Sequence, residues 1–422
     1  MNSDTTPTKS TDRKVTAGLR GAAWNPDLIP KDMRSSIHSL PTGDGAQVTG
    51  CLHALGGEDT VIFIMHPREL LLTHYLVPHL VTGGFACWVQ GPRTVGNDLR
   101  LEHETALFDV AAGVMHLRAE GFRNIILLGN SGGAGLFAFY HQQASLPVTD
   151  RVPHSPGGRP TRLEEAEMPL VDGFVLVSPH PGQGKLLQSM IDPSLTDESD
   201  AFSIDPELFP FSKENGYRRA EEGGARYAPE FIERYRRAQA ARVSRLDDSA
   251  RELIRLRMAA KKRMKERPCL SDAMVSSHQH IFQVWRTDAD LRCFDLSLDP
   301  SDRRFGSVWG SRPMASNVGS VGFARNCTPE SWLSTWSGLS SNASFEKCGP
   351  AITQAVLMIE YSGDNSVFPS DLDAIFDSLG STDKQRTRIR GNHHGQSLTL
   401  DEANGQDLAG AAAVEWLQAK FG

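Results

Sequence analysis

Short apolar runs that alternate with helical segments constrain the fold of this chain more than any other feature. Three such runs are TVIFIMHP (60–67), GGFACWVQGPR (83–93) and NIILLGNS (124–131), and none of them alternates strictly between apolar and polar residues. Residues 101–121 carry apolar side chains at helical spacing and end at Gly121, a typical helix-terminating residue. Apolar strands that alternate with helices predict a mostly parallel sheet with helices on both faces.

A long insertion interrupts this pattern. Further strand candidates and a closing helix lie at 46–55, 171–181, 351–369, 387–396 and 408–422. Residues 182–350 hold no comparable series of strands, and 227–267 reads as an arginine-rich, solvated helix. We therefore expect a disordered N-terminal tail (1–20), an α/β core built from 21–181 and 351–422, and a cap domain formed by 182–350.

Charge and cysteine content exclude several classes of protein. The chain has 422 residues and a net charge of -7, which gives no reason to expect nucleic acid or a membrane as a partner. It has neither a secretory signal pattern nor a run of about 18 apolar residues. Its six cysteines are scattered without a CxxC pair, so we expect reduced, mostly buried thiols of a cytoplasmic protein rather than a disulfide framework or a metal site. A Cys327–Cys348 bridge is the minor alternative, and no cofactor is expected. A homodimer is expected on base rates alone.

The segment GNSGG (129–133) joins the third apolar run to an apolar helical segment. A dinucleotide-binding loop would need glycines where Ser131 and Ala134 stand, and no G-K-[ST] follows for a phosphate loop. Two interpretations remain, a turn of small residues that only allows close packing and a nucleophile elbow. In an elbow, Gly129 and Gly133 avoid collisions with the adjacent helix and strand, and the strained serine faces a helix N-terminus that stabilises an oxyanion.

A nucleophile elbow predicts three further elements in a fixed order along the chain. These are an oxyanion loop after the third strand, an acid after a late strand, and a histidine near the end. The chain offers IMHPREL (64–70), then Asp364 in MIEYSGDNSVFP (358–369), then two histidines in RGNHHGQS (390–397). This ordered set favours the elbow over the close-packing alternative.

Three motifs carry a resemblance to a known family. They are Gly-x-Ser-x-Gly at 129–133, His-Pro-x at 66–68 and Gly-Asp-x-x-Val-x-Pro at 363–369. On these motifs the chain resembles the α/β-hydrolase superfamily over residues 46–181 and 351–422. The resemblance implies an α/β-hydrolase fold, with a mostly parallel central sheet, helices on both faces and a large, mainly helical cap insertion.

The resemblance also implies catalytic roles. Ser131 is the expected nucleophile and Asp364 the expected acid that orients the histidine. The family pattern G-x-x-H, counted from Gly391, favours His394 as the general base. Counting with a small polar residue directly before the base gives His393, which remains the alternative.

The expected oxyanion hole combines two backbone N–H groups. One belongs to Gly132, and the resemblance assigns the other to Arg68, two residues after His66, because Pro67 has no N–H. The Arg68 side chain is expected to be a solvated or salt-bridged surface arginine, and contact with a substrate carboxylate is the alternative. His66 is expected to shape the loop.

Candidate substrate contacts lie near the strand ends and in the cap. They are His66, His180, Trp285, Trp309, Trp332 and Trp336. The simpler interpretation of the tryptophans is packing inside the cap. The functional interpretation is that they form the wall of a pocket for an apolar or aromatic group.

Together these features predict a serine hydrolase. It would cleave a carboxylic ester of a medium-sized, largely apolar or aromatic small molecule through an acyl-enzyme. Alternatives are a carbon–carbon bond hydrolase acting on a diketone or ring-fission product, an amidase or acyltransferase, and a non-catalytic ligand-binding protein of the same fold.

Overall fold

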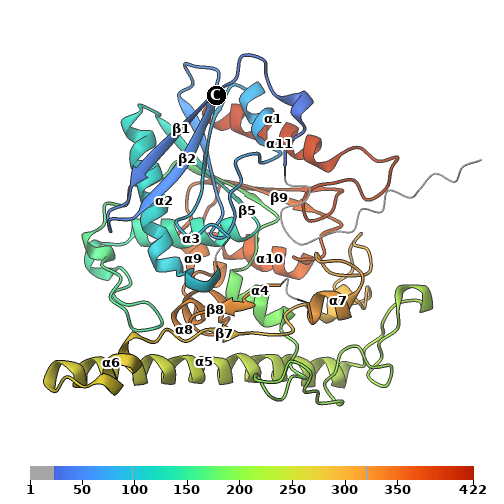
Figure 1. The fold of residues 1–422 in the computed structure, drawn as a ribbon. Helices are drawn as coiled ribbons and strands as arrows, with labels where there is room; N and C mark the ends of the chain where they lie inside the picture. The colour runs from blue at the N-terminus through green and yellow to red at the C-terminus, as the bar shows by residue number, and fades with distance from the viewer. Residues whose placement is uncertain (1–22, 97, 320–321) are drawn as a thin grey trace, which may run out of the picture.

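A computed structural model describes residues 23–96, 98–319 and 322–422, and the tail expected at 1–20 lies outside the described residues. An eight-stranded sheet of order β1-β2-β4-β3-β5-β6-β9-β10 forms the centre of the molecule (Figure 1). Its strands are β1 (Arg34–Pro41), β2 (Gln47–Ala54), β3 (Thr60–Met65), β4 (Ala86–Gln90), β5 (Asn124–Asn130), β6 (Gly173–Val177), β9 (Ala355–Tyr361) and β10 (Lys384–Ile389). Strands β1, β2 and β4 pair antiparallel, and every pairing from β4 to β10 is parallel.

Helices cover both faces of this sheet (Figure 1). On one face lie α1 (Val77–Thr82) and α11 (Gly405–Phe421), and on the other lie α2 (His103–Ala119), α3 (Gly132–Ser145), α9 (Phe345–Cys348) and α10 (Pro369–Ser378). The central strands β3, β4 and β6 are buried along their whole length because they are covered on both sides. The expected fold class, a mostly parallel sheet flanked by helices, is confirmed.

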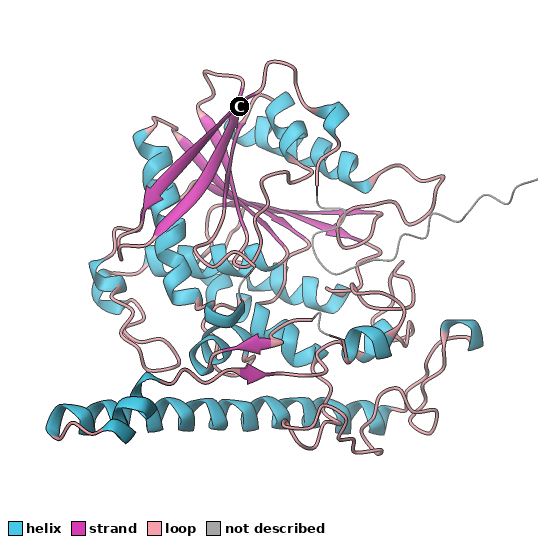
Figure 2. Ribbon diagram, viewed as in Figure 1, coloured by secondary structure: helices cyan, strands magenta, loops and turns pink. Residues whose placement is uncertain are grey.

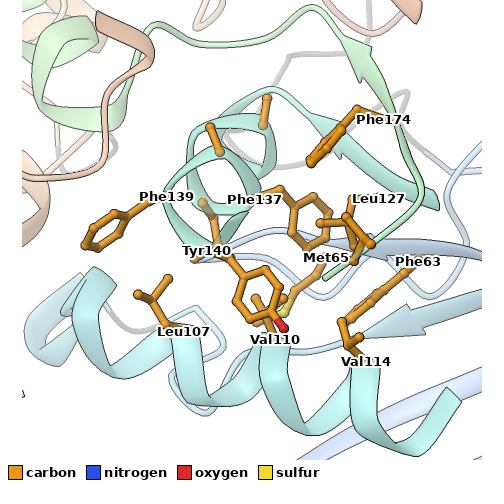
Figure 3. Packing of buried hydrophobic residues seen from close by; sticks show 14 of the residues in the cluster. Phe63, Met65, Leu107, Val110, Val114, Leu127, Phe137, Phe139, Tyr140 and Phe174 are labelled. Carbon is orange, nitrogen blue, oxygen red and sulfur yellow. The ribbon is translucent and has the colours of Figure 1, made fainter. Parts of the chain in front are cut away.

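The core beside α3 fixes the strand ends that carry the site. Figure 3 shows α2 and α3 packing their apolar side chains against those of the sheet. The rings of Phe63 from β3 and Phe137 from α3 meet edge to face with centroids 5.5 Å apart, and both side chains are fully buried. Each buried side chain of this size contributes about 1.5–3 kcal/mol to stability. The junction between β5 and α3 is therefore held by the main core.

The two ends of the sheet differ from the sequence-based expectation. The first strand, β1, was not predicted, and β10 spans Lys384–Ile389 rather than 387–396. Both are edge strands with partly exposed, polar residues, as Arg386 shows by pairing with Glu360 on β9. An edge strand with solvated side chains lacks the apolar run that marks a buried strand.

The insertion lies below the sheet in the view of Figure 1, and helices are the main regular elements in it. Its regular elements are α4 (Gln183–Met190), α5 (Pro229–Glu266), α6 (Leu270–Ser277), β7 (Phe282–Gln283), α7 (Pro313–Asn317), β8 (Asn326–Cys327), α8 (Pro329–Ser331) and a π-helical turn at Trp332–Trp336. Figure 2 shows the long helix α5 along its outer edge, with the β7–β8 ribbon between α5 and the sheet. Near its end, residues 343–348 pack into the main core cluster rather than into the cap.

Helix α5 has one buried face and one solvated face. Phe231, Tyr235 and Leu246 point into the insertion. On the outer face Arg237 pairs with Glu233 over one turn, with both side chains about 70% exposed. The solvated face that the sequence predicted for this helix therefore carries ion pairs between its arginines and acidic residues.

An ion pair lies buried in the middle of the insertion. Asp192 Oδ2 accepts hydrogen bonds from Arg286 Nε at 2.8 Å, from Arg286 Nη2 at 2.6 Å and from Asn317 Nδ2 at 2.9 Å. The third guanidinium nitrogen of Arg286 donates to the carbonyl of Ser203. Because neither charge reaches solvent, each depends on the other for compensation.

All six cysteines are among the described residues, and none forms a disulfide. Five are buried and Cys269 is exposed. In the described part of the chain, no helix combines the length and the apolar character needed to cross a bilayer.

We predict that Asp192→Asn destabilises the protein by about 3–5 kcal/mol, because it leaves the Arg286 guanidinium buried without a carboxylate. The free energy of unfolding, from urea titration followed by tryptophan fluorescence, measures this loss. Glu233→Gln is the matched control, since breaking the exposed Arg237 pair costs less than about 1 kcal/mol. Equal losses for both variants would contradict this account of the insertion.

Candidate active site

The turn from β5 into α3 holds Ser131 in a strained backbone conformation. Its φ is 55° and its ψ is -122°, a region that non-glycine residues rarely adopt. A methyl group added at Gly129 would lie 2.5 Å from the Ala134 Cα, and one added at Gly133 would lie 2.4 Å from the Met65 carbonyl oxygen. The predicted reason for both glycines, close approach of the neighbouring helix and strand, is therefore confirmed.

Backbone hydrogen bonds tie this turn to the end of β6. The N–H of Ser131 donates to the carbonyl of Val177 at 2.9 Å, and the N–H of His180 donates to the carbonyl of Ser131 at 3.1 Å. The Asn130 amide also donates to the Val177 carbonyl. The loop after β6 is thus fixed directly beside the serine.

Ser131, His393 and Asp364 form one hydrogen-bonded chain. His393 Nδ1 lies 2.7 Å from Asp364 Oδ2, and His393 Nε2 lies 3.2 Å from Ser131 Oγ. The other carboxylate oxygen of Asp364 accepts the N–H groups of Ser366 and Val367. Burial opposes the charge on Asp364, but His393 and these two N–H groups outweigh burial and lower the carboxyl pKa below its usual value. An ionised Asp364 therefore fixes the His393 proton on Nδ1 and leaves Nε2 free to accept the Ser131 proton.

His393, the alternative, and not the preferred His394 is the histidine that lies between Asp364 and Ser131. The backbone N–H of His394 donates to Asn392 Oδ1, and its ring Nδ1 is buried without a partner. Burial, followed by repulsion from His393, lowers the pKa of His394 to about 3. Counting from Gly391 failed because the turn presents its second residue after the glycine, rather than its third, to Asp364.

A second imidazole, that of His180, also reaches the nucleophile. Its Nε2 lies 2.9 Å from Ser131 Oγ and 3.3 Å from Ser366 Oγ, and its Nδ1 lies 3.1 Å from Gln183 Oε1. The His180 and His393 rings stack with centroids 5.4 Å apart. Burial, followed by repulsion from His393, lowers the pKa of His180 to about 3, so this ring is neutral at physiological pH. His180 was predicted only as a substrate contact, and its position beside the serine carries no sequence motif.

The backbone N–H of Arg68 is not free to bind an oxyanion. It donates to His66 Nδ1 at 3.2 Å, and so does the N–H of Glu69. The predicted role of the Arg68 N–H is therefore contradicted, because the loop folds back onto its own histidine. The Arg68 side chain forms a bidentate salt bridge with Asp98, at 2.5 and 2.7 Å, as expected for a structural arginine.

Aromatic side chains of the insertion lie beside His180. The Phe323 ring is 6.5 Å from the His180 ring, 5.4 Å from Trp309 and 6.0 Å from Trp336. The Arg68 guanidinium lies 5.2 Å from the Phe323 ring and equally far from the Trp336 ring. Phe323 was missed because a single aromatic residue in a glycine-rich loop shows no periodicity.

The other two tryptophans predicted as substrate contacts, Trp332 and Trp285, pack elsewhere in the insertion. Trp332 is fully buried in the insertion and donates its Nε1 proton to Asp247 at 2.8 Å. Trp285 packs beneath the Arg325 guanidinium at 6.0 Å. Among the described residues, neither tryptophan contacts Ser131, His180 or His393. Both therefore agree with the simpler interpretation, which is packing inside the cap.

The chain was compared with family models, curated proteins and solved structures. No family model and no curated protein sequence matches the chain. Among solved structures it is similar to DcsB in complex with its substrate analogue (14% identity, TM-score 0.48, covering 92% of this chain and 100% of that chain), to an esterase of Pyrococcus furiosus (12%, 0.46, 94% and 95%) and to the alpha/beta hydrolase GrgF of Penicillium sp. (11%, 0.47, 92% and 99%).

The strand order and the serine turn assign the fold. A mostly parallel eight-stranded sheet, with a strained serine between the fifth strand and its helix, defines an α/β-hydrolase fold. At these identities and TM-scores the solved structures add no argument about activity.

We predict that Gly133→Ala destabilises the protein by about 1–3 kcal/mol, because the added methyl group collides with the rigid Met65 carbonyl. Gly135→Ala, two residues further along α3, is the control. Its methyl group would lie 3.5 Å from the Gly182 Cα, an ordinary contact, so better helix propensity makes it neutral or stabilising by up to about 1 kcal/mol. Thermal unfolding of the two variants against the wild type measures the difference, and a loss for Gly135→Ala as large as for Gly133→Ala would contradict the close-packing argument.

Proposed function

We propose that this chain is a serine hydrolase that cleaves a carboxylic ester through an acyl-enzyme. The observation that carries the proposal is the chain of hydrogen bonds from Asp364 through His393 to Ser131. A serine hydroxyl is a weak nucleophile, and it needs a base within hydrogen-bond reach that is itself oriented by a third group. These three residues meet that requirement on a turn that exposes the serine at the end of a central strand.

The proposed reaction has two halves. Ser131 Oγ bonds to the substrate carbonyl carbon while its proton moves to His393 Nε2 and the carbonyl π electrons move to the oxygen. When the tetrahedral intermediate collapses, the bond to the leaving alcohol breaks, and the alcohol oxygen takes the proton from His393. Water then attacks the acyl-enzyme by the same proton transfers and releases the acid. The ionised Asp364 stabilises the His393 imidazolium that forms in each half.

The surroundings of the serine support a largely apolar or aromatic substrate. Phe323 lies next to His180 and contacts Trp309 and Trp336, so aromatic side chains of the insertion lie beside the imidazole that reaches the serine. Binding sites for small molecules are lined mainly by such side chains with a few polar groups among them. The substrate is proposed to be a medium-sized small molecule that places an apolar group against these rings.

Ser131→Ala is expected to abolish both hydrolysis of p-nitrophenyl butyrate and covalent labelling by a fluorophosphonate, because both reactions need the hydroxyl. The measurement is release of p-nitrophenol together with mass spectrometry of the labelled peptide. No labelling of the folded wild type would contradict the hydrolase proposal. Turnover of a vinylogous diketone in preference to the ester would favour the carbon–carbon bond hydrolase instead.

The two neighbouring histidines provide a matched pair of variants. We expect His393→Gln to lower kcat by about 10⁴-fold or more, because it removes the base that takes the serine proton. His394→Gln changes a side chain that does not touch Ser131, so it is expected to keep most of the activity. Steady-state kinetics on the same ester measures both, and the opposite ranking would overturn the assignment of the base.

A further inference from the structure

Two side-chain nitrogens converge on Gly132, the residue directly after Ser131. A methyl group added at Gly132 would lie 2.9 Å from His66 Nε2 and 2.7 Å from Gln183 Nε2. Both side chains are almost completely buried, with exposed fractions of 6% for His66 and 2% for Gln183. The space against the first turn of α3 is therefore bounded by polar atoms rather than by apolar groups.

Hydrogen bonds fix which nitrogen of His66 carries the proton. The N–H groups of Arg68 and Glu69 both donate to Nδ1, so Nδ1 must offer a lone pair. Burial, followed by repulsion from Arg68 and the neighbouring imidazoles, lowers the pKa of His66 well below its usual value. The ring is therefore neutral, and its one proton is on Nε2, the atom that faces Gly132.

No acceptor in the described part of the chain takes these protons. Both hydrogen bonds of the His66 ring are made by Nδ1, and Gln183 Nε2 is buried without a partner. Gln183 uses its carbonyl oxygen on His180, which turns its NH₂ group toward Gly132. A buried donor that lacks an acceptor, such as Gln183 Nε2, is costly, and such donors are typical of sites where a substrate supplies the negative charge.

We propose that His66 is a catalytic residue that donates its Nε2–H to the oxyanion formed on the substrate, beside the backbone N–H of Gly132. This inference rests on the proposed hydrolase function and deepens it. His66 takes the place that sequence reasoning gave to the Arg68 N–H, and the Arg68 N–H instead fixes the His66 tautomer. When Ser131 attacks, the carbonyl π electrons move to the oxygen, and the Nε2–H bond of His66 points at the new charge without any proton leaving the ring.

The neutral state of His66 suits it to this task. A hydrogen-bond donor that is already oriented stabilises charge in the transition state without reorganising at the moment of reaction. His66 is not a second base, because its only free ring nitrogen carries the proton. Gln183 Nε2 adds a further donor at the same place, so the oxyanion would meet several fixed dipoles in a buried site.

The decisive variant is His66→Asn. Its Oδ1 occupies about the position of Nδ1 and still accepts the N–H groups of Arg68 and Glu69, while the Nε2 donor is lost. We expect kcat for p-nitrophenyl butyrate to fall by about 10²–10³-fold with KM little changed, because the lost bond exists only in the transition state. His66→Ala removes both interactions and is expected to lose stability as well.

Affinity for an alkyl trifluoromethyl ketone separates catalysis from loop support. This ketone adds to Ser131 and forms a hemiketal whose oxyanion resembles that of the reaction. We expect its inhibition constant to rise for His66→Asn by the same factor as kcat/KM falls. A purely structural role for His66 would not couple the two quantities while KM and the thermal unfolding temperature stay at the wild-type values.

His74→Asn is the control. His74 Nδ1 also accepts a backbone N–H, from Leu76, but its Nε2 has a protein partner, Asn130 Oδ1, at 3.3 Å. This variant is expected to lower stability without weakening ketone binding relative to substrate binding. The inference is overturned if His66→Asn keeps kcat/KM and ketone affinity within about threefold of the wild type. A wild type that is neither labelled by a fluorophosphonate nor inhibited by the ketone overturns the hydrolase proposal and this inference together.

Discussion

The strained backbone of Ser131 is the constraint on which the rest of the site depends. At φ 55° the chain turns sharply enough to place Oγ beyond the end of β5 and to start α3 directly behind it. Strain of this kind costs about 1–3 kcal/mol and persists only where the surroundings enforce it. Here the surroundings are the end of β6, whose Val177 carbonyl accepts the Ser131 N–H, the following loop, whose His180 N–H donates to the Ser131 carbonyl, and two glycines that let Met65 and Ala134 approach. The packed core of α2, α3 and the sheet stabilises that arrangement.

Several imidazoles crowd this serine, and their environments separate their roles. His393 alone is paired with a carboxylate, Asp364, which orients it and stabilises its charged form. Burial keeps His180 and His66 neutral, so in the proposed reaction the imidazolium of His393 has no second charged imidazole beside it. His180 is then a neutral neighbour whose Nε2 accepts the proton of the Ser366 hydroxyl, and we propose His66 as a fixed donor. Similar rings thus support different steps because each has a different partner on its second nitrogen.

The sequence predicted the parts of this molecule that depend on local patterns. Apolar runs identified the buried strands, and the glycines around Ser131 identified the turn, because both consequences follow from close packing of nearby residues. Edge strand β1 escaped because solvated strands have no apolar run. His394 was preferred over His393 because a turn that is one residue shorter leaves no mark in the sequence. The use of the Arg68 N–H by His66, and the approach of Phe323 to His180, depend on how loops fold back in space, and spacing along the chain does not encode that.

The central claim is that Ser131 carries the acyl group during turnover. The most direct measurement is rapid acid quenching of the wild type during hydrolysis of p-nitrophenyl butyrate, followed by mass spectrometry of the peptides. The account predicts a butyryl group on the peptide that contains Ser131, formed together with a burst of p-nitrophenol. Turnover at a measurable rate with a butyryl group on another residue, or a burst with an unmodified Ser131 peptide, would contradict it.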